Sequence, residues 1–298
     1  MKRIFSLNIF RPHALWISSE ENLAPWLVRL ASIMDLDSCE NNEDCASEDA
    51  GLIMFVNRDH ECDYPFNREN SGWKSLSLKN LDIWRNDSSP EVYIELKRNN
   101  ESTEIINMNC SMLPVYDRAV SSGGLPFHAG LAELDGKGFL LAADGNTGKS
   151  TCCSRLPRYF NPLSDDEALV VRKEDGSYAA HPFPTWSDHM WRRMNRTCNV
   201  NESVPLDAVF FIHQSEADEL VRLGEGESAA LTSRSAGQVY EKFFWQVDGD
   251  TGGETRKRLF TNACALCLNV RSYRLGVSLE GEFWKLIESV LAQKEDGS

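Results

Sequence analysis

The sequence predicts a mixed α/β (α+β) protein made of two parts. Short apolar runs alternate with helix-period patterns along the whole chain. A Ser-Ser-Gly-Gly break at residues 121–124 separates a first part without chemical motifs from a second part that carries several. In the second part, an apolar run at 138–142 leads into a Gly-Lys-Ser segment that a helix-compatible stretch follows. We therefore expect an N-terminal α+β module over residues 1–112 and a larger domain over residues 113–298.

The elements of the first part each have a local signal. Polar residues interrupt the apolar residues of segment 1–10, and no small-residue cleavage site follows. This segment therefore predicts a first strand and no signal peptide. Apolar residues at three- and four-residue spacing over 26–34 predict an amphipathic helix. Further expected elements are a solvated acidic loop at 35–49, a buried strand at 51–56, and a strand pair at 91–97 and 103–108 with a turn at 98–102.

The second part reads as alternating strands and turns with three helices. Asp135 and Gly136 predict a hairpin turn between two apolar runs. The expected strands are 129–134, 139–142, 168–172, 178–181, 206–212 and 266–270, and the expected helices are 149–156, 228–244 and 283–293.

Composition excludes some classes of protein. The chain has 298 residues and a formal net charge of −14, which argues against non-specific nucleic-acid binding because that needs a basic surface. It has no run of about 18 apolar residues, so we expect no membrane-spanning helix. These features predict a cytoplasmic protein that binds neither nucleic acid nor membrane.

The nine cysteines have irregular spacing, which does not suggest a disulfide framework. Cys264 and Cys267 form a C-x-x-C pair, which is half of a zinc site or a redox pair, but the sequence has no second C-x-x-C. Buried reduced thiols are the favoured interpretation. His60 and Cys62 with Cys39 and Cys45 are another possible metal-binding group, although their spacing matches no common ligand pattern.

The segment from Ala143 to Thr151 is typical of a phosphate-binding loop. In such loops, backbone N–H groups cradle phosphate oxygens, the lysine (here Lys149) reaches the outer phosphates, and the following hydroxyl (Ser150) coordinates Mg²⁺. Ala143 occupies the place of the first glycine of the usual pattern, and a surface turn is the alternative. The expected nucleotide-binding residues are Asp144, Gly145, Asn146, Thr147, Gly148, Lys149, Ser150 and Thr151.

Two further motifs flank this loop. His128 precedes it at the edge of an expected strand, and the carboxylate pair Asp165 and Asp166 follows it. Phosphoryl transfer needs a phosphate cradle, a divalent metal and a group that positions or deprotonates the acceptor hydroxyl. One aspartate can serve the metal and the other can act as the base. A helix cap or turn is the alternative for the pair, and a structural role is the alternative for His128.

These three motifs, in this order, resemble those of the HPr serine kinase/phosphorylase family. The resemblance covers about residues 120–175. It extends loosely to residues 272–275 and 283–284, which resemble shorter HPr-kinase-related proteins of peptide-modification gene clusters. Among these are the serine kinases of lasso-peptide pathways and the ScmC proteins of the SynChlorMet cassette. The resemblance implies a P-loop core similar to that of phosphoenolpyruvate carboxykinase, distinct from the common doubly wound P-loop fold.

The resemblance also implies a role for each motif residue. Lys149 contacts the β- and γ-phosphates, and Ser150 binds Mg²⁺. Asp166 accepts the proton of the acceptor hydroxyl, and Asp165 assists the metal. His128 lies near the transferred phosphate.

The chain departs from the family pattern at several positions. Ala129, Ala143 and Asn146 replace family glycines, which can stiffen or reshape the loop. The later metal-binding glutamate of the family has only Asp188 as a weak substitute. Candidates for the family's catalytic arginine are Arg256, Arg258, Arg271 and Arg274.

We therefore expect an HPr-kinase-like enzyme that uses ATP or another nucleoside triphosphate with Mg²⁺. It would phosphorylate a Ser or Thr hydroxyl on a peptide or protein, such as a ribosomally made precursor peptide. One alternative is a degenerate nucleotide-binding protein that recruits a precursor peptide or a maturation enzyme without chemistry. Another is a different P-loop hydrolase or a small-molecule kinase. The acceptor and the oligomeric state stay open.

Overall fold

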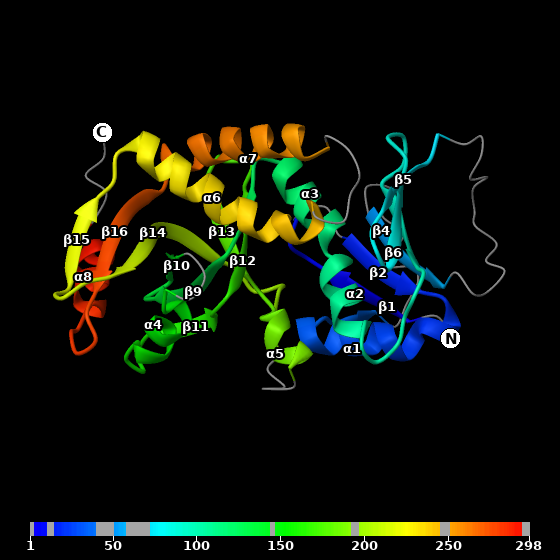
Figure 1. The fold of residues 1–298 in the computed structure, drawn as a ribbon, viewed down its shortest axis with the longest axis horizontal. Coiled ribbons are helices and arrows are strands. Elements are labelled where there is room, and N and C mark those ends of the chain that lie inside the picture. The colour runs from blue at the N-terminus through cyan, green and yellow to red at the C-terminus, as the bar shows by residue number, and fades with distance from the viewer. Residues whose placement is uncertain are drawn as a thin grey trace. The chain divides into compact units, whose positions relative to one another are not determined.

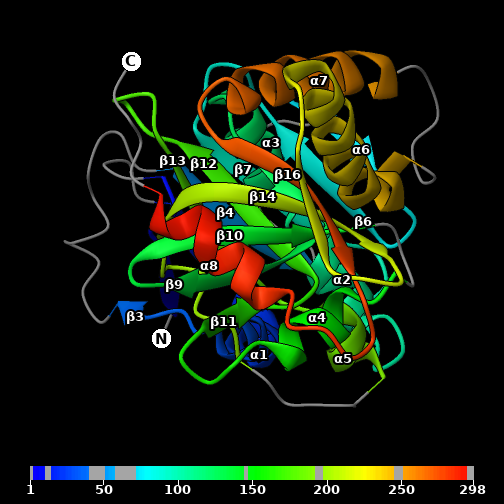
Figure 2. The ribbon, with the colours of Figure 1, turned by 90° about the vertical axis from the view of Figure 1, so that its left-hand side faces the viewer.

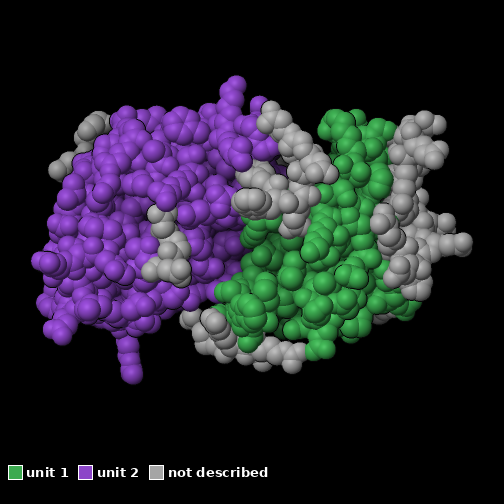
Figure 3. Space-filling model, viewed as in Figure 1, with its two compact units in different colours: residues 1–115, 186–201, 242–249 green, residues 116–185, 202–241, 250–298 purple. Residues whose placement is uncertain are grey.

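A computed structural model describes residues 3–10, 15–39, 51–57, 72–143, 147–191, 197–244 and 251–293. It confirms a mixed α/β protein with two mixed β-sheets (Figure 1). The chain divides into two compact units (Figure 3). Unit 1 holds residues 1–115, 186–201 and 242–249, and unit 2 holds residues 116–185, 202–241 and 250–298. Unit 1 thus includes residues 113–115, 186–201 and 242–249, which the expected division after residue 112 places in the C-terminal domain.

Unit 1 is built on a seven-stranded sheet in the order β3-β1-β2-β4-β7-β6-β5. The central strands β2, β4 and β7 run parallel, whereas the pairs toward both margins are antiparallel. The strands are β1 (Ile4–Leu7), β2 (Leu15–Ser19), β3 (Ser38–Cys39), β4 (Gly51–Asn57), β5 (Lys74–Ser77), β6 (Leu81–Arg85) and β7 (Glu91–Leu96).

The helix α1 (Ala24–Met34) forms where the apolar spacing predicted it. Pro25 lies in its first turn, where the missing N–H costs nothing. The helix buries its apolar face, including Trp26, whose ring lies 4.7 Å from that of Phe55 in β4. Asp35 ends the helix with a left-handed backbone (φ 51°).

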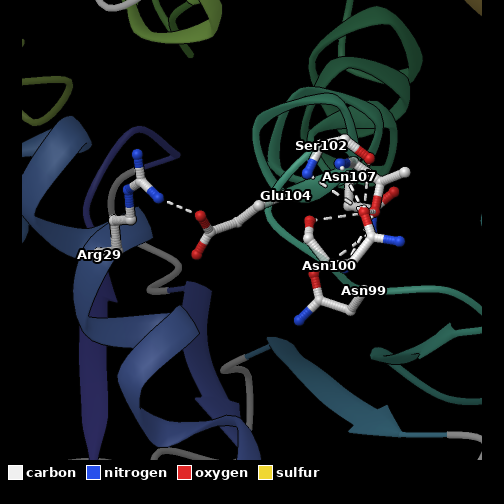
Figure 4. Close-up of polar contacts among 7 residues, drawn as sticks. Arg29, Asn99, Asn100, Ser102, Glu104 and Asn107 are labelled. Atoms are coloured by element: carbon white, nitrogen blue, oxygen red, sulfur yellow. Dashed lines mark hydrogen bonds and ion pairs between the residues drawn. The ribbon is translucent and has the colours of Figure 1, made fainter.

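The predicted strand at 103–108 is wrong, because this segment begins helix α2 (Glu104–Cys110). Asn100 explains the difference. Its side-chain oxygen accepts hydrogen bonds from the backbone N–H groups of Ser102 and Thr103, and its carbonyl accepts one from Glu104 (Figure 4). This turn starts a helix. The segment cannot pair with β7 as a further strand, because β4 and β6 already occupy both sides of β7.

Arg29 of α1 also forms an ion pair with Glu104, as Figure 4 shows. Unit 1 further contains helix α5 (Trp186–Met190).

Unit 2 is built on a nine-stranded sheet in the order β11-β9-β10-β14-β13-β12-β8, with β16 paired to β14 and β15 paired to β16. Its strands are β8 (Leu125–Phe127), β9 (Ala129–Leu134), β10 (Lys137–Ala142), β11 (Asn161–Ser164), β12 (Glu167–Arg172), β13 (Tyr178–Phe183), β14 (Val204–Gln214), β15 (Glu219–Arg222) and β16 (Arg271–Val277). The strands β10, β14 and β16 run parallel. Long β14 joins two regions of the sheet, because its start pairs with β13 and its remainder with β10 and β16.

Helices α4 (Lys149–Arg155) and α8 (Trp284–Ala292) pack on one face of this sheet. Their buried residues form one core with Phe139, Phe210 and Tyr273 of the parallel strands. Figure 2 shows α8 against β9 and β10. The other helices here are α3 (Leu113–Ser121) and α6 (Glu225–Phe244), through which the division into units passes, and α7 (Thr251–Cys267).

The predicted strand at 266–270 is also wrong. Leu266 and Cys267 end α7, and a turn leads from there to β16. Leu266 is buried at helical spacing from Ala263 and Leu259, so the apolar run belongs to a helix face. The other strands and helices predicted for the second part are confirmed within a few residues at each end. Within the described residues, the helices include none with the length and apolar character needed to span a membrane.

Candidate functional site

The predicted phosphate loop lies between a buried strand and a short helix. Strand β10 is flanked by β9 and β14, and its last residue, Ala142, leads into the loop. Gly148 has φ 103° just before α4, a backbone conformation that favours glycine. Thr147 is half-buried, and Ser150 and Thr151 are exposed on the first turn of α4. The predicted loop residues Asp144, Gly145 and Asn146 lie outside the described residues.

Lys149 turns inward from the start of α4. Its side chain is buried, with 7% exposed. The ammonium donates to the Ala143 carbonyl at 3.2 Å and lies 2.8 Å from His128 Nε2. The chain therefore holds the lysine amine at the mouth of the loop, next to the predicted histidine.

His128 connects Lys149 to Asp166. Its Nδ1 lies 3.5 Å from Asp166 Oδ1. An ammonium only donates hydrogen bonds, so the Nε2 atom that faces it accepts. We assign the neutral ring with its proton on Nδ1, directed at the carboxylate. Burial lowers the pKa of His128, the Lys149 charge lowers it further, and the Asp166 charge opposes both. This balance is consistent with a neutral ring.

Strand topology explains why residues so far apart in the chain meet. His128 is the single residue between β8, which pairs with β12, and β9, which pairs with β10 and β11. Asp165 and Asp166 are the two residues between β11 and β12. The chain thus crosses between the same two groups of strands at both places, and the crossings bring His128 and Asp166 together.

Asp165 has a different environment from Asp166. Its Oδ1 accepts a hydrogen bond from the Thr185 hydroxyl, at the end of the segment that follows β13. Asp166 keeps 35% of its side chain exposed and faces His128. The adjacent carboxylates therefore have separate partners.

A close packing contact fixes α4 on this part of the sheet. A Cβ atom on Gly130 of β9 would lie 2.5 Å from Cys153 Sγ of α4 and 3.3 Å from the Ser164 carbonyl oxygen. Only glycine leaves room for this approach. Burial raises the pKa of the Cys153 thiol to about 12, and the nearby Asp165 charge adds to the effect. Cys153 is therefore a packing residue.

Sequence reasoning missed two residues that support this site. Ser235 of α6 is buried, and its hydroxyl oxygen accepts from the His128 N–H at 3.1 Å and donates to the His128 carbonyl at 3.4 Å. Glu167 is buried beside the acid pair and accepts a hydrogen bond from the Tyr116 hydroxyl. The charge of Glu167 at the start of an apolar strand was a usable signal, whereas nothing local marks Ser235.

The Ser164 hydroxyl closes the turn that carries the acid pair. It is buried and donates to the Glu167 carbonyl at 2.9 Å. A short turn closed in this way holds Asp165 and Asp166 in one orientation.

The arginine candidates have other partners. Arg271 forms an ion pair with Asp207 at 2.7 Å, and Arg274 one with Glu227. Arg258 lies 3.7 Å from Glu254. Arg256 lies over the start of α7, 3.5 Å from where a Cβ on Gly252 would stand. Asp188 belongs to α5 in unit 1.

In the described part of the chain, no group of three or more His, Cys, Asp or Glu residues is placed to hold a metal ion, so Cys264 and Cys267 do not belong to such a group. Cys264 and Cys267 are free, half-buried thiols on α7. Burial raises the pKa of Cys267. Cys39 is half-buried in β3, and the expectations for Cys45, His60 and Cys62 lie outside the described residues.

Comparison with known proteins identifies the family. A model of the family described as SynChlorMet cassette protein ScmC matches residues 92–292. The chain belongs to this family. The resemblance to ScmC proteins is therefore confirmed. A search of curated proteins returned no match.

The ScmC match contains every residue of the candidate site. It begins within β7 and extends through α8, so it includes His128, Lys149 and Asp166 as well as the supporting Ser235. The chemical groups available here are a buried ammonium, a neutral imidazole and a partly exposed carboxylate, each in contact with the next.

Proposed function

We propose that this ScmC-family protein is an ATP-dependent kinase with an HPr-kinase-like P-loop core, which phosphorylates a Ser or Thr hydroxyl of a peptide. The observation that carries the proposal is the contact series from Lys149 through His128 to Asp166. Phosphoryl transfer needs a cation at the phosphates and a carboxylate at the acceptor hydroxyl. Both groups stand here on either side of one imidazole.

The loop residues fit a nucleotide phosphate chain. Lys149 is the first residue of α4 and brings a buried positive charge, which favours a polyanion at this point of the chain. Lys149 would exchange the Ala143 carbonyl for phosphate oxygens. The second contact, to His128, would hold the amine in place during this exchange.

The donor set also fits Mg²⁺ as it occurs with nucleotides, which is bound by one or two protein oxygens together with phosphates. Ser150 offers an exposed hydroxyl directly after Lys149, and Asp165 offers a carboxylate whose orientation Thr185 fixes. When bound, Mg²⁺ would neutralise charge that develops on the phosphates. ATP is the proposed donor, and another nucleoside triphosphate would use the same contacts.

Asp166 is the proposed base. Its exposed fraction leaves it open to a hydroxyl, and the His128 Nδ1–H holds its other side by electrostatic attraction. The acceptor oxygen would form the new bond to phosphorus as the bond from phosphorus to the leaving oxygen breaks. The hydroxyl proton would pass to Asp166. A neutral His128 suits this arrangement, because a protonated ring could not accept from Lys149.

Membership of a cassette-protein family supports a peptide as the acceptor. The candidate acceptors are peptides encoded in the same gene cassette, in particular a ribosomally made precursor. A partner protein with an exposed Ser or Thr is compatible with the same chemistry.

The test is transfer of labelled phosphate from ATP to these peptides by the purified protein with Mg²⁺. We expect Lys149→Ala and Asp166→Asn each to lower the rate at least about a hundredfold. Lys173→Ala and Glu174→Gln, in the exposed turn between β12 and β13, are matched controls and should keep the rate. Retained transfer by both site variants would contradict the proposed mechanism. Release of phosphate into water, with none transferred to a peptide, would favour a P-loop hydrolase.

A nucleotide-binding protein without transfer is the second candidate. The specific observation in its favour is that Lys149 and Asp165 already have partners within the protein, namely Ala143, His128 and Thr185. Such a protein would recruit a precursor peptide or a maturation enzyme. Nucleotide binding that Lys149→Ala weakens, with no phosphate transferred or released, would favour it.

A further inference from the structure

Strand β15 is an edge strand of the sheet in unit 2. Among the strands of the described residues it pairs only with β16, and Figure 1 shows it at the outer side of β16. Glu219, Val221 and Arg222 are exposed, Val221 by 53%. A strand with one unpaired side presents a row of backbone donors and acceptors that a further strand can use.

The register shows which backbone groups face outward. Val221 stands opposite Arg274, and the N–H of Leu223 donates to the Ser272 carbonyl at 2.9 Å. Backbone groups in an antiparallel pair alternate between facing the partner and facing away. Val221 therefore directs its N–H toward β16, and Leu220 and Arg222 direct theirs away from the sheet.

Among the described residues, the other two edge strands of this sheet differ from β15. They are β8 and β11, and each contains a proline, Pro126 or Pro162. A proline lacks the backbone donor and so protects an edge strand against pairing with a further strand. Strand β15 has no proline, so its donor row is complete.

The edge strand β15 and the candidate site lie at the same end of the parallel strands. The parallel strands end at one edge of the sheet, and the register row joins Ala142 to Phe211, Phe211 to Arg274 and Arg274 to Val221. Ala142 is the residue before the phosphate loop segment begins. Ala142 pairs in turn with Ala129 of β9, the residue after His128, which contacts Asp166. A chain paired with β15 would stand five strand spacings from β9, roughly 24 Å, a distance that about seven extended residues span.

We propose that β15 docks an extended segment of the acceptor peptide as an additional strand, which holds the peptide within reach of Asp166. This inference rests on the proposed function for the identity of the occupant. Backbone pairing would supply affinity with little dependence on sequence, and the exposed Val221 would contact alternate side chains of the peptide. The hydroxyl to be phosphorylated would lie about seven residues from the docked segment.

The experiment measures binding of a fluorescein-labelled synthetic peptide, covering the candidate precursor of the same cassette, to the full-length protein without nucleotide. Arg222→Pro removes one outward donor and no bond to β16, and we expect it to weaken binding roughly tenfold. The matched control Arg222→Ala keeps the donor and should bind as the unchanged protein does. Val221→Pro removes a donor that faces β16, so it should lower the melting temperature, which Arg222→Pro should not.

Equal loss in Arg222→Pro and Arg222→Ala, or no loss in either, would overturn the proposal, as would failure of the unchanged protein to bind the peptide. The protein could instead form a dimer that Arg222→Pro converts to monomer while the peptide affinity stays unchanged. That result would show that a second copy pairs with β15, and it would also overturn the proposal. Lys149→Ala should keep the peptide affinity. Binding that depends on β15, without phosphoryl transfer, would refute the kinase proposal and leave β15 as the docking strand.

Discussion

The hydroxyl of Ser235 bonds to both backbone groups of His128, although 107 residues separate them. It accepts from the N–H and donates to the carbonyl, so α6 holds the histidine at the crossing between β8 and β9. His128 in turn lies between Lys149 and Asp166. Ser235 is therefore a positioning residue for the whole series.

Substitution of this serine tests the positioning role. Ser235→Ala leaves the part-buried N–H of His128 without this acceptor, and we expect it to lower the free energy of unfolding by about 1–2 kcal/mol. It should also shift the ring resonances of His128 in NMR spectra, because the ring loses its fixed position. Ser233→Ala, two residues away and half-buried, is the control and should shift neither quantity. Unchanged His128 resonances in Ser235→Ala would contradict the positioning role.

The lowered pKa of His128 predicts how stability depends on pH. The unfolded chain binds a proton at this residue near pH 6.5, and the folded chain does so only at lower pH, chiefly because burial disfavours the charged ring. The unfolded state therefore binds more protons between these two values, so stability falls as pH drops below about 6.5. Urea unfolding between about pH 5 and pH 8 measures the slope.

His128→Gln should flatten that slope, and His213→Gln is the control. His213 lies on β14 with 40% of its side chain exposed, outside the series of contacts. The same slope in His128→Gln and the unchanged protein would show that another group causes the pH dependence.

The contact between Gly130 and Cys153 predicts a steric cost. A methyl group at residue 130 would overlap the Cys153 sulfur, so Gly130→Ala should lower the free energy of unfolding by about 1–3 kcal/mol. Adding Cys153→Ala to this variant should recover part of the loss, because it removes the sulfur. Urea unfolding of the two single variants and the double variant gives the coupling energy.

The control for this prediction is Gly237→Ala in α6. Apart from its chain neighbours and the backbone of its own helix, no heavy atom of the described residues lies within 4 Å of a Cβ at that position, so alanine should be neutral or stabilise the helix by up to about 1 kcal/mol. Additive effects of Gly130→Ala and Cys153→Ala would mean that the two residues do not touch as the structure shows.

Local patterns were reliable where one interaction dominates. The apolar spacing of α1 and the Asp135-Gly136 turn were read correctly, because burial of one helix face and a left-handed backbone leave local marks. The strands predicted for segments 103–108 and 266–270 are wrong. Their apolar runs suit either structure, and the Asn100 turn and the packing of α7 decided for helix.

The sequence by itself determined which chemical groups this protein has and where the chain must turn. It contained the Gly-Lys-Ser segment, the acid pair and the preceding histidine, and its Asp135-Gly136 pair predicted a turn. Only the tertiary structure decided that His128 lies between Lys149 and Asp166 and that Ser235 holds it there. Such contacts depend on strand pairing and helix packing between distant segments, which local side-chain preferences do not specify.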